Sequence, residues 1–345
     1  MYSVAVLEPN RVALVSLPDP APGPYEARVR TELACLCNAT DRKLVQGHFP
    51  GLDRYPLLLG HETVGVVDAV GDKVRSFRVG DRLVGGLLLR PNDPAYASGW
   101  GGFSEYTLAG DHAAMVADGV ATPEQGYFEV YEIMRTVPPD IPVEAALLLC
   151  TWREVYAAFE DFNLQPGDDI LVYGGGPVGL SFVKFARRLG LGWVGLVDPL
   201  PEKRERALRS GADAAFSPGD AALGELTCSR GKALDRVIDA VGSENIINAA
   251  LPLIRMAGSV CVYGVIDRPA VKVQKELGPF NFNLLIHQWP TRAREALAQE
   301  PLCEWIRQGL LDPAEFISAE FPIAQIEQAL RLSDTGRTLK TLLRF

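Results

Sequence analysis

The stretch LVYGGGPVG, at residues 171–179, joins an apolar strand to a glycine-rich turn with the spacing G-x-G-x-x-G. Its glycines are Gly174, Gly176 and Gly179, while Pro177 and Val178 open a helix-like run. Glycine lets the backbone turn tightly and approach a diphosphate, to which a helix N-terminus offers free N–H groups. The stretch therefore predicts a dinucleotide site. The alternative interpretation is a tight turn in an α/β domain that binds nothing.

An acidic residue, Asp198, directly follows a second apolar strand at residues 193–197. A carboxylate at this place accepts hydrogen bonds from the adenosine ribose hydroxyls and repels a 2′-phosphate. The pattern therefore predicts that NAD is preferred over NADP. Lys203 on the following helix is a further candidate for a contact with the ribose, and a solvated helix face is the alternative for it.

Strands and helices continue to alternate as far as residue 290. Strand-like runs at residues 169–173, 193–197, 236–240 and 259–265 are separated by helix-like runs, which indicates a doubly wound parallel sheet. Ligands bind at the carboxyl ends of the strands in such sheets. We therefore expect four residues at strand ends to line the cofactor site: Ala240, Val241, Tyr263 and Val265.

The remainder of the chain has a different pattern. Residues 1 to about 150 are rich in Val, Gly and Pro, with short strand-like runs separated by turns, which is typical of a mostly β domain. Beyond residue 290, two helix-like runs precede a strand-like segment at 338–345 that can return to that domain. The predicted domains are thus residues 1–152 with 291–345, and residues 153–290.

Composition excludes several classes of protein. The formal net charge is −9 with acidic and basic residues interspersed, which argues against nucleic-acid binding. No apolar run reaches the roughly 18 residues of a membrane span, and the N-terminus lacks the basic start of an export signal. The six cysteines are then expected to be reduced thiols or metal ligands in a cytoplasmic protein.

Three residues of the mostly β domain form a candidate metal site: Cys37, His61 and Cys150. Two thiolates and one imidazole leave one tetrahedral position on zinc open, which is the arrangement of a catalytic metal. Glu62 is a candidate for an additional, movable ligand, and Asp41 for orienting the imidazole. The alternative is that each cysteine is buried as a small hydrophobic residue.

The chain resembles the zinc-dependent medium-chain alcohol and polyol dehydrogenases over nearly its whole length. The resemblance rests on motifs in the family's order: Cys37 with Asp41, the run GHETVG at 60–65, GFSEY at 102–106, Cys150, the glycine turn and Asp198. It implies a GroES-like mostly β catalytic domain, a Rossmann coenzyme domain, and hydride transfer between NAD(P) and an alcohol. The Cys₂His zinc set is itself known from alcohol dehydrogenase. A homodimer or homotetramer is also implied.

The chain departs from the family around the first metal ligand. One extra residue separates Cys37 from Asp41, so Asn38 is the alternative occupant of the ligand position. Cys37 is favoured because a thiolate binds zinc far better than a neutral amide. Thr40 is then the hydroxyl expected to relay the proton of the alcohol, although Ala39 stands at the family's usual spacing. His48 is a second candidate relay, with a solvated loop position as its alternative.

Two further departures concern longer segments. Residues 85–102 contain no cysteine, whereas the family's structural zinc site needs four, so we predict a single catalytic zinc and no structural zinc. Some polyol and sugar dehydrogenases share this loss, which favours a polyol, sugar or cyclitol substrate by analogy. Residues 117–134 are longer than in the family and are interpreted either as a cap over the active site or as a surface insertion.

Two other function classes compete with this interpretation. A zinc-free quinone or enone reductase of the same fold would need neither Cys37 nor Cys150, and a metal assay separates it from a zinc enzyme. A non-catalytic nucleotide-binding protein would fail to turn over cofactor with any alcohol. Sequence thus predicts a zinc- and NAD-dependent alcohol dehydrogenase without identifying its substrate.

Overall fold

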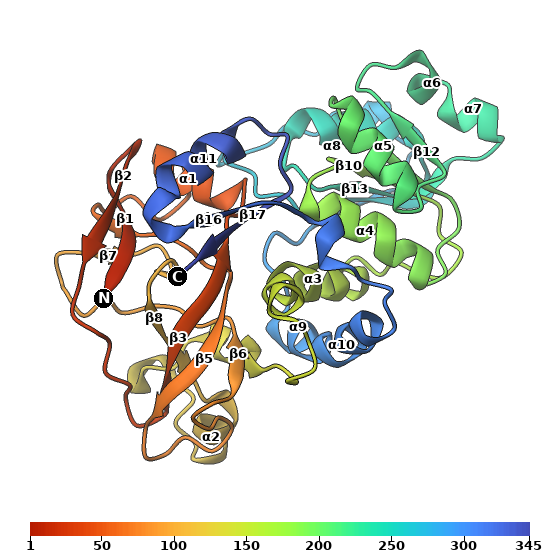
Figure 1. Ribbon diagram of the computed structural model, residues 1–345. Helices are drawn as coiled ribbons and strands as arrows, with labels where there is room; N and C mark the ends of the chain where they lie inside the picture. Colours follow the sequence, from red (N-terminus) through yellow and green to blue (C-terminus); the bar gives the residue numbers. More distant parts are fainter. The chain divides into compact units, whose positions relative to one another are not determined.

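The computed structural model describes residues 1–345 and divides into two compact units (Figure 1). Unit 1 consists of Met1–Arg153 and Glu295–Phe345, and unit 2 of Glu154–Arg294. The chain passes between the units within two helices, α3 (Val143–Asp161) and α9 (Arg292–Leu297). None of the helices combines the length and the apolar character needed to cross a bilayer.

Unit 2 is built on a six-stranded sheet in which every pair of neighbours is parallel. Its central strands are buried along their whole length, as expected where helices cover both faces of a parallel sheet. This confirms the predicted doubly wound sheet. The strands, in spatial order, are β12 (Ala214–Phe216), β11 (Val194–Val197), β10 (Ile170–Tyr173), β13 (Leu234–Asp239), β14 (Ile254–Val262) and β15 (Asn283–Ile286).

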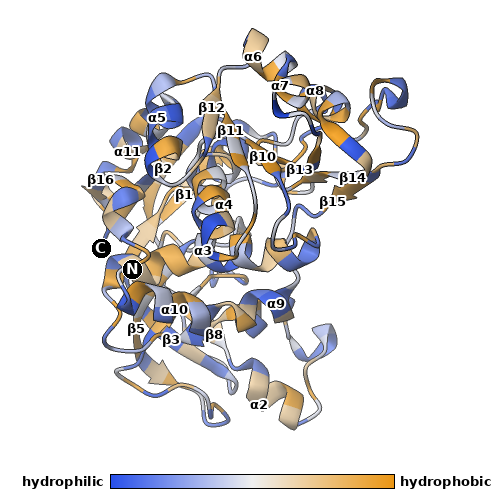
Figure 2. Cartoon of the chain, turned by 90° about the vertical axis from the view of Figure 1, so that its right-hand side faces the viewer, coloured by the Kyte–Doolittle hydropathy of each residue, from blue (hydrophilic) through white to orange (hydrophobic).

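Helices connect these strands and close the core of unit 2. Leu171, Val237 and Val260 of the sheet pack with Ile247 and Leu251 of the helical connections in one buried cluster. Figure 2 shows β10 and β13 mainly in the hydrophobic colours. The helices are α4 (Pro177–Arg188), α5 (Pro201–Arg209), α6 (Ala221–Gly224), α7 (Leu226–Arg230) and α8 (Glu244–Ala250), with 3-10 turns η3 (Leu251–Leu253) and η4 (Lys275–Leu277).

Unit 1 contains a seven-stranded sheet that includes the last strand of the chain. This strand, β17, lies between β16 and β3, parallel to the former and antiparallel to the latter (Figure 1). The C-terminal segment therefore does return to the mostly β part of the chain. The strands are β16 (Ile317–Pro322), β17 (Lys340–Arg344), β3 (Glu26–Cys35), β5 (Thr63–Val70), β6 (Arg82–Val84) and β9 (Arg135–Thr136), with β8 (Tyr106–Gly110) paired to β3.

A smaller four-stranded sheet and several short helices complete unit 1. The sheet contains β2 (Arg11–Ser16), β1 (Tyr2–Glu8), β4 (Leu57–Leu58) and β7 (Ala97–Ser98). The helices are α1 (Thr40–Gln46), α2 (His112–Ala117), α10 (Gln299–Arg307) and α11 (Ile326–Asp334), with 3-10 turns η1 (Pro123–Gln125), η2 (Glu129–Ile133), η5 (Pro313–Glu315) and η6 (Ile323–Gln325). One core cluster packs Val6, Leu36, Leu59, Phe103 and Leu343 together.

The segment at residues 117–134 covers a second hydrophobic cluster of unit 1. Tyr131 is buried, and its hydroxyl donates to Glu26 Oε1 over 2.9 Å. Its ring fills the space beside Gly110, where a Cβ atom would fall 2.1 Å from a ring carbon. Arg90 lies over the ring of Phe128, with 4.8 Å between the guanidinium carbon and the ring centre. The long segment thus packs on residues of the cysteine-free 85–102 stretch.

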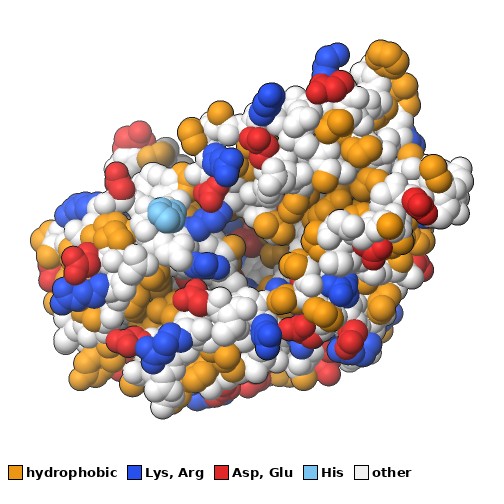
Figure 3. All heavy atoms as spheres, turned by 90° about the horizontal axis from the view of Figure 1, so that it is seen from above, with side chains coloured by type: hydrophobic (Ala, Val, Ile, Leu, Met, Phe, Trp, Pro, Cys, Tyr) orange, Lys and Arg blue, Asp and Glu red, His pale blue; other side chains and the backbone are white.

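Charges of both signs are distributed over the surface. On the face shown in Figure 3, Lys and Arg side chains lie among Asp and Glu side chains, without one large patch of a single sign. This agrees with the interspersed charges of the sequence.

Candidate active site: a metal-ligand cluster and a nucleotide turn

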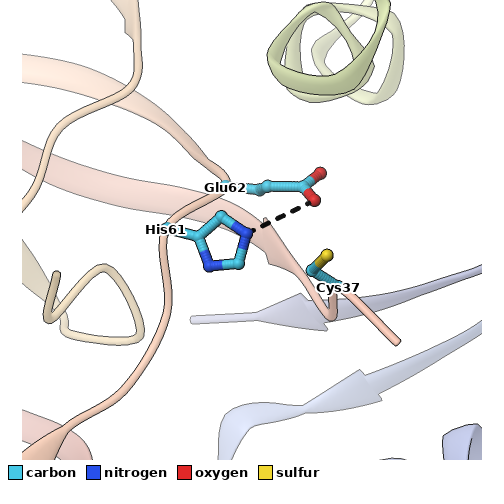
Figure 4. A group of neighbouring side chains, drawn as sticks. All are labelled: Cys37, His61 and Glu62. Atoms are coloured by element: carbon cyan, nitrogen blue, oxygen red, sulfur yellow. Dashed lines mark ion pairs between the residues drawn. The ribbon is translucent and has the colours of Figure 1, made fainter. Parts of the chain in front are cut away.

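Three side chains of unit 1 bring together a thiol, an imidazole and a carboxylate. The ligand atoms of Cys37, His61 and Glu62 all lie within 4.8 Å of one another. Figure 4 shows the three side chains directed toward a common centre, with His61 Nε2 3.8 Å from Glu62 Oε1. Sulfur, imidazole nitrogen and carboxylate oxygen are the three kinds of atom that zinc binds in proteins. The donor set therefore fits zinc.

The loop from Cys37 to Asp41 closes on itself. Asp41 N–H donates to Cys37 O over 3.0 Å, and the N–H of Cys37 donates to Asp41 Oδ2 over 2.8 Å. The other carboxylate oxygen, Asp41 Oδ1, lies 3.4 Å from His61 Nδ1. One buried carboxylate thus holds the loop that carries Cys37 and lies close to the His61 ring, where its charge favours a proton on the imidazole.

The structure places Cys37, and not Asn38, in the cluster. The Asn38 side chain donates from Nδ2 to the carbonyls of Thr338 and Leu339, over 3.1 and 3.2 Å. Its Oδ1 accepts the hydroxyl hydrogen of Ser333 over 2.7 Å. Because both ends of the amide are engaged by the segment before β17, Asn38 serves to anchor the loop.

The His61 imidazole lies in an electrostatic environment that favours positive charge. Burial by itself lowers the pKa of His61, but Asp41 and then Cys37 raise it, and the result is a pKa well above the ordinary value. A place that stabilises a proton on an imidazole between a carboxylate and a thiol also suits a bound cation.

Glu62 is held by a network of buried groups. Lys340 Nζ lies 2.6 Å from both carboxylate oxygens, and Oε2 also accepts from Thr151 Oγ1 and Cys35 Sγ, each over 3.0 Å. Burial acts to raise the pKa of Glu62, but Lys340 and His61 outweigh it, so that the pKa is lowered. Glu62 is therefore an anion at neutral pH, fixed by a lysine that reaches it from β17.

The other predicted residues of unit 1 lie around this cluster. Cys150 is buried on α3, and its Sγ is 3.7 Å from the carbonyl of Thr63, the neighbour of Glu62, but it is not among the three mutually close ligand residues. Thr40 is the first residue of α1 and is partly buried. His48 is exposed just beyond that helix, where its N–H donates to Lys43 O.

Close backbone packing fixes the segment that leads into His61. Gly60 has φ +104°, and a Cβ atom there would fall 2.3 Å from the ring of Phe103. The N–H of Gly102 donates to Gly60 O over 2.7 Å, and Phe103 N–H donates to Leu59 O over 2.9 Å. The residues just before His61 are thus hydrogen-bonded through their backbone to the segment at 99–103.

In unit 2, the glycine turn joins β10 to α4. Gly174 has φ +100°, and a Cβ at Gly179 would fall 1.7 Å from Gly174 O. Gly176 precedes Pro177 at the start of α4 with no side-chain cap, and no atom lies within 4 Å of the place of its missing Cβ. Gly174 and Gly179 are therefore required for the backbone conformation and close packing of the turn. Gly176 instead leaves open space beside the uncapped N–H groups of α4, which favours the binding of a phosphate.

Asp198 lies directly after β11 beside this turn. Its Oδ2 accepts the N–H of Gly175 over 2.7 Å, and its Oδ1 accepts that of Leu200 over 2.8 Å. The stem of Lys203 is adjacent, since a Cβ on Gly175 would lie 3.0 Å from Lys203 Cβ. The predicted ribose carboxylate is therefore held rigidly next to the glycine turn.

The remaining predicted cofactor residues lie at the same edge of the sheet. Tyr173, Asp239 and Val262 are paired across β10, β13 and β14, so Ala240, Val241, Tyr263 and Val265 all follow the carboxyl ends of these strands. The Asp239 carboxylate accepts the N–H groups of Val241, Gly242 and Ser243 over 2.8–2.9 Å. Burial raises the pKa of Asp239 despite these bonds.

Sequence reasoning did not identify several supporting residues. Cys35, Thr151 and Lys340 have no local signal, because their partner Glu62 is remote from two of them in sequence and no local pattern joins them. Asp239 is different, because it closes the strand whose end the sequence already places at the cofactor site.

Comparisons with known proteins identify the family. A model described as "Zinc-binding dehydrogenase" matches residues 177–291, and "Alcohol dehydrogenase GroES-like domain" matches residues 23–118. The "Starvation-sensing protein RspB" of Escherichia coli is 28% identical over 360 residues, covering 100% of this chain and 99% of that protein. A "Probable zinc-binding alcohol dehydrogenase" of Mycobacterium tuberculosis is 34% identical over 278 residues, covering 77% and 69%.

Among solved structures, an Escherichia coli RspB structure complexed with NADH has a TM-score of 0.80 at 24% identity, covering 100% of this chain and 99% of that one. At that identity the likeness shows the fold. The fold and the donor set define a zinc-binding dehydrogenase with a GroES-like unit and a nucleotide-binding unit. The chain belongs to the zinc-binding medium-chain alcohol dehydrogenase family, and it is an alcohol dehydrogenase-type oxidoreductase.

Proposed function

We propose that the chain oxidises an alcohol with NAD as the hydride acceptor and uses a single catalytic zinc. The observation that carries the proposal is the cluster of Cys37, His61 and Glu62. Cys150 is proposed as the further ligand, supported by its burial and by its contact with the carbonyl next to Glu62. The two proposed domains are those of the sequence, residues 1–152 with 291–345 for the metal and 153–290 for the coenzyme.

Different residues of unit 1 have different proposed roles in the reaction. When bound, zinc lowers the pKa of an alcohol hydroxyl and stabilises the alkoxide. Asp41 holds the His61 ring, and Lys340 keeps Glu62 ionised. Thr40 is proposed to relay the hydroxyl proton, its oxygen accepting that proton as its own O–H proton is passed on towards solvent. His48, which is exposed, is the proposed exit to solvent.

Preference for NAD over NADP is proposed from Asp198. Both of its oxygens are fixed by backbone N–H groups beside the glycine turn, so its charge cannot easily move away from a 2′-phosphate. The Escherichia coli RspB structure contains NADH, which supports the same cofactor here. This proposal also includes the residues that are expected to line the cofactor site. They are Gly174, Gly176, Gly179, Lys203, Ala240, Val241, Tyr263 and Val265.

Two finer expectations from the resemblance are retained as proposals. The first is an oligomer of two or four chains, supported by the exposed edge strand β15 and by Phe280, which is 97% exposed beside it. The second is the polyol, sugar or cyclitol class of substrate, which rests on the missing cysteines of residues 85–102. The aromatic side chain beside His61 instead favours an alcohol with a flat apolar substituent, so the two substrate classes are alternatives, and a comparison of glycerol with benzyl alcohol separates them.

The central test combines metal analysis with turnover. Purified wild-type chain is expected to contain one zinc and to reduce NAD with at least one member of a panel of alcohols, with a lower kcat/KM for NADP. Asp198→Ala should reduce this cofactor preference without changing the zinc content. A zinc-free chain that still reduces enones with NADPH would support the reductase alternative, and no turnover with any alcohol would support a binding protein.

A further inference from the structure

Trp100 has a backbone conformation that a large side chain rarely adopts. It lies just after β7 with φ +69°, in the left-handed region that favours glycine. Its neighbours Gly99, Gly101 and Gly102 have the backbone freedom that such a turn requires, yet the position between them carries the largest side chain. Conformations of this kind are found preferentially at binding and catalytic sites.

Hydrogen bonds on both sides of Trp100 maintain this conformation. The N–H groups of Gly99 and Gly101 donate to Leu58 O over 2.8 and 3.3 Å. Trp100 O accepts from Leu88 N–H over 2.8 Å, and Trp100 N–H donates to Ser98 Oγ over 3.1 Å. The strained backbone is thus tied to the segment that leads directly into His61.

The indole ring lies beside the imidazole of the metal cluster. The ring centres of Trp100 and His61 are 5.4 Å apart, with an angle of 57° between their planes. Phe49 meets the same indole edge-on, at 5.5 Å and 89°. Both aromatic side chains are partly buried at the margin of a core cluster. Trp100 also packs on the cluster that contains Met115 and Tyr131. The indole is thus the aromatic neighbour of the cluster's imidazole, and Phe49 supports the indole from its other contact.

Such a neighbour discriminates between classes of alcohol. Aromatic rings pack favourably against flat apolar groups in offset or edge-on arrangements. The hydroxyl groups of a polyol gain no acceptor from the carbon surface of an indole and lose water when they are placed against it. The geometry therefore favours an alcohol whose carbinol carbon carries a planar, apolar substituent.

We propose that Trp100, supported by Phe49, is a specificity-determining residue that selects alcohols with an aromatic or similarly flat apolar substituent over polyols and sugars. This inference rests on the proposed function, because it assigns a substrate class to the same metal site. The proposal also explains why this position carries a tryptophan, although its φ of +69° is a conformation that glycine would adopt without strain.

The first experiment measures kcat/KM with NAD for benzyl alcohol, ethanol and glycerol. Wild-type chain should prefer benzyl alcohol, and Trp100→Gly, which also relieves the backbone strain, should lower its kcat/KM by about 10- to 100-fold. The value for ethanol should change by less than about threefold, which is within the range of one weak contact. Trp100→Phe should restore most of the loss, and Trp305→Leu, which alters a partly buried tryptophan on α10 of the same unit, is the control.

The second experiment does not depend on turnover. Isothermal titration of the zinc-loaded chain with imidazole and with phenylimidazole should give tighter binding of the phenyl derivative, and Trp100→Gly should abolish the difference. Equal losses for all alcohols together with a lower zinc content would assign Trp100 a merely structural role and overturn the inference. So would a wild-type preference for glycerol. If no alcohol is oxidised, the proposed function fails, and the titration still decides the role of Trp100.

Discussion

Cys37 and Asn38 are adjacent in the chain but belong to different parts of unit 1. The sequence left either as the first metal ligand, because one residue is inserted before Asp41. The structure distinguishes the two residues, because the Asn38 amide is hydrogen-bonded to Ser333, Thr338 and Leu339. These partners lie about three hundred residues further along, so no local pattern could have revealed them. The thiol of Cys37 is left to the cluster.

Substitution of the two neighbours should therefore have separate effects. Cys37→Ser is expected to abolish stable zinc binding, because one of the cluster's donors is lost. Asn38→Ala should keep its zinc but lower the free energy of unfolding by about 1–3 kcal/mol, the usual cost of unpaired buried partners. Elemental analysis and urea unfolding of both variants measure these outcomes. A zinc-free Asn38→Ala chain that remains folded would reopen the assignment of the ligand.

The Glu62–Lys340 pair is a second feature that acts at the level of single residues. Both side chains are buried, so removal of the lysine leaves an uncompensated carboxylate. Lys340→Met should destabilise the chain by about 3–5 kcal/mol, and adding Glu62→Gln should recover a large part of this. Lys275→Met, at an exposed site, should change stability by less than about 0.5 kcal/mol. Additive losses in the double variant would show that the two residues act independently.

At the scale of elements, Asp111 connects helix α2 to the turn at residues 75–76. Its Oδ1 accepts from Ala114 N–H and Ser76 Oγ–H, and its Oδ2 accepts the N–H groups of Arg75 and Ser76. Burial alone would raise the pKa of Asp111, but the hydrogen bonds from Ala114, Arg75 and Ser76 lower it below its usual 3.8. The ionised form is therefore the one that the folded chain stabilises.

This shift gives a stability change with a definite pH range. The contribution of ionised Asp111 is fully present above pH 3.8 and is lost as the pH falls through the lower folded-state value. Asp111→Asn should cost about 1.5–3 kcal/mol at pH 7, the range for hydrogen bonds to a charged group. The difference from wild type should shrink below pH 3.8. Urea unfolding of both chains from pH 7 to pH 3 tests this, and a difference that grows in acid would contradict it.

The elements differ in how far the sequence could predict them. The succession β10, turn, α4 and β11 was predicted because each part has a strong pattern of its own and the parts are contiguous. The short strands β12 and β16 were not, since three to six residues of mixed burial become strands only through their neighbours. The first of the two helix-like runs expected beyond residue 290 is in fact two helices, α9 and α10, separated at Ala298. Trp100 was not singled out, because a positive φ at tryptophan has no sequence pattern.

At the scale of the whole molecule, zinc should stabilise unit 1 selectively. Its proposed ligands come from the loop after β3, the two residues just before β5 and helix α3, so the metal would cross-link these segments. At a free zinc concentration near 1,000 times the Kd, the stabilisation is about 4 kcal/mol. Calorimetry before and after dialysis against a chelator should show a lower transition temperature for one part of the chain, restored by added zinc. A Cys37→Ser chain should show no such response.

The affinity for zinc should also depend on pH. In the metal-free chain the pKa of His61 lies well above its usual 6.5, so zinc must displace a proton that the folded site holds firmly. As the pH falls through this raised pKa, more of the imidazole is protonated and zinc binds more weakly. Competition with a fluorescent zinc indicator between pH 9 and pH 6 measures the effect. A pH-independent affinity would exclude His61 as a ligand.

The position of β17 between β16 and β3 determines the order in which parts of the chain can fold during translation. Unit 2 is continuous and is complete once residue 294 has emerged, whereas β3, His61 and Glu62 are synthesised long before β17. Until Lys340 follows, β3 has β5 and β8 as partners but lacks β17 along residues 33–35, and Glu62 lacks its cation. The earliest strands of the nascent chain therefore finish folding last, and a short open edge at residues 33–35 is exposed to incorrect pairing until β17 has been made.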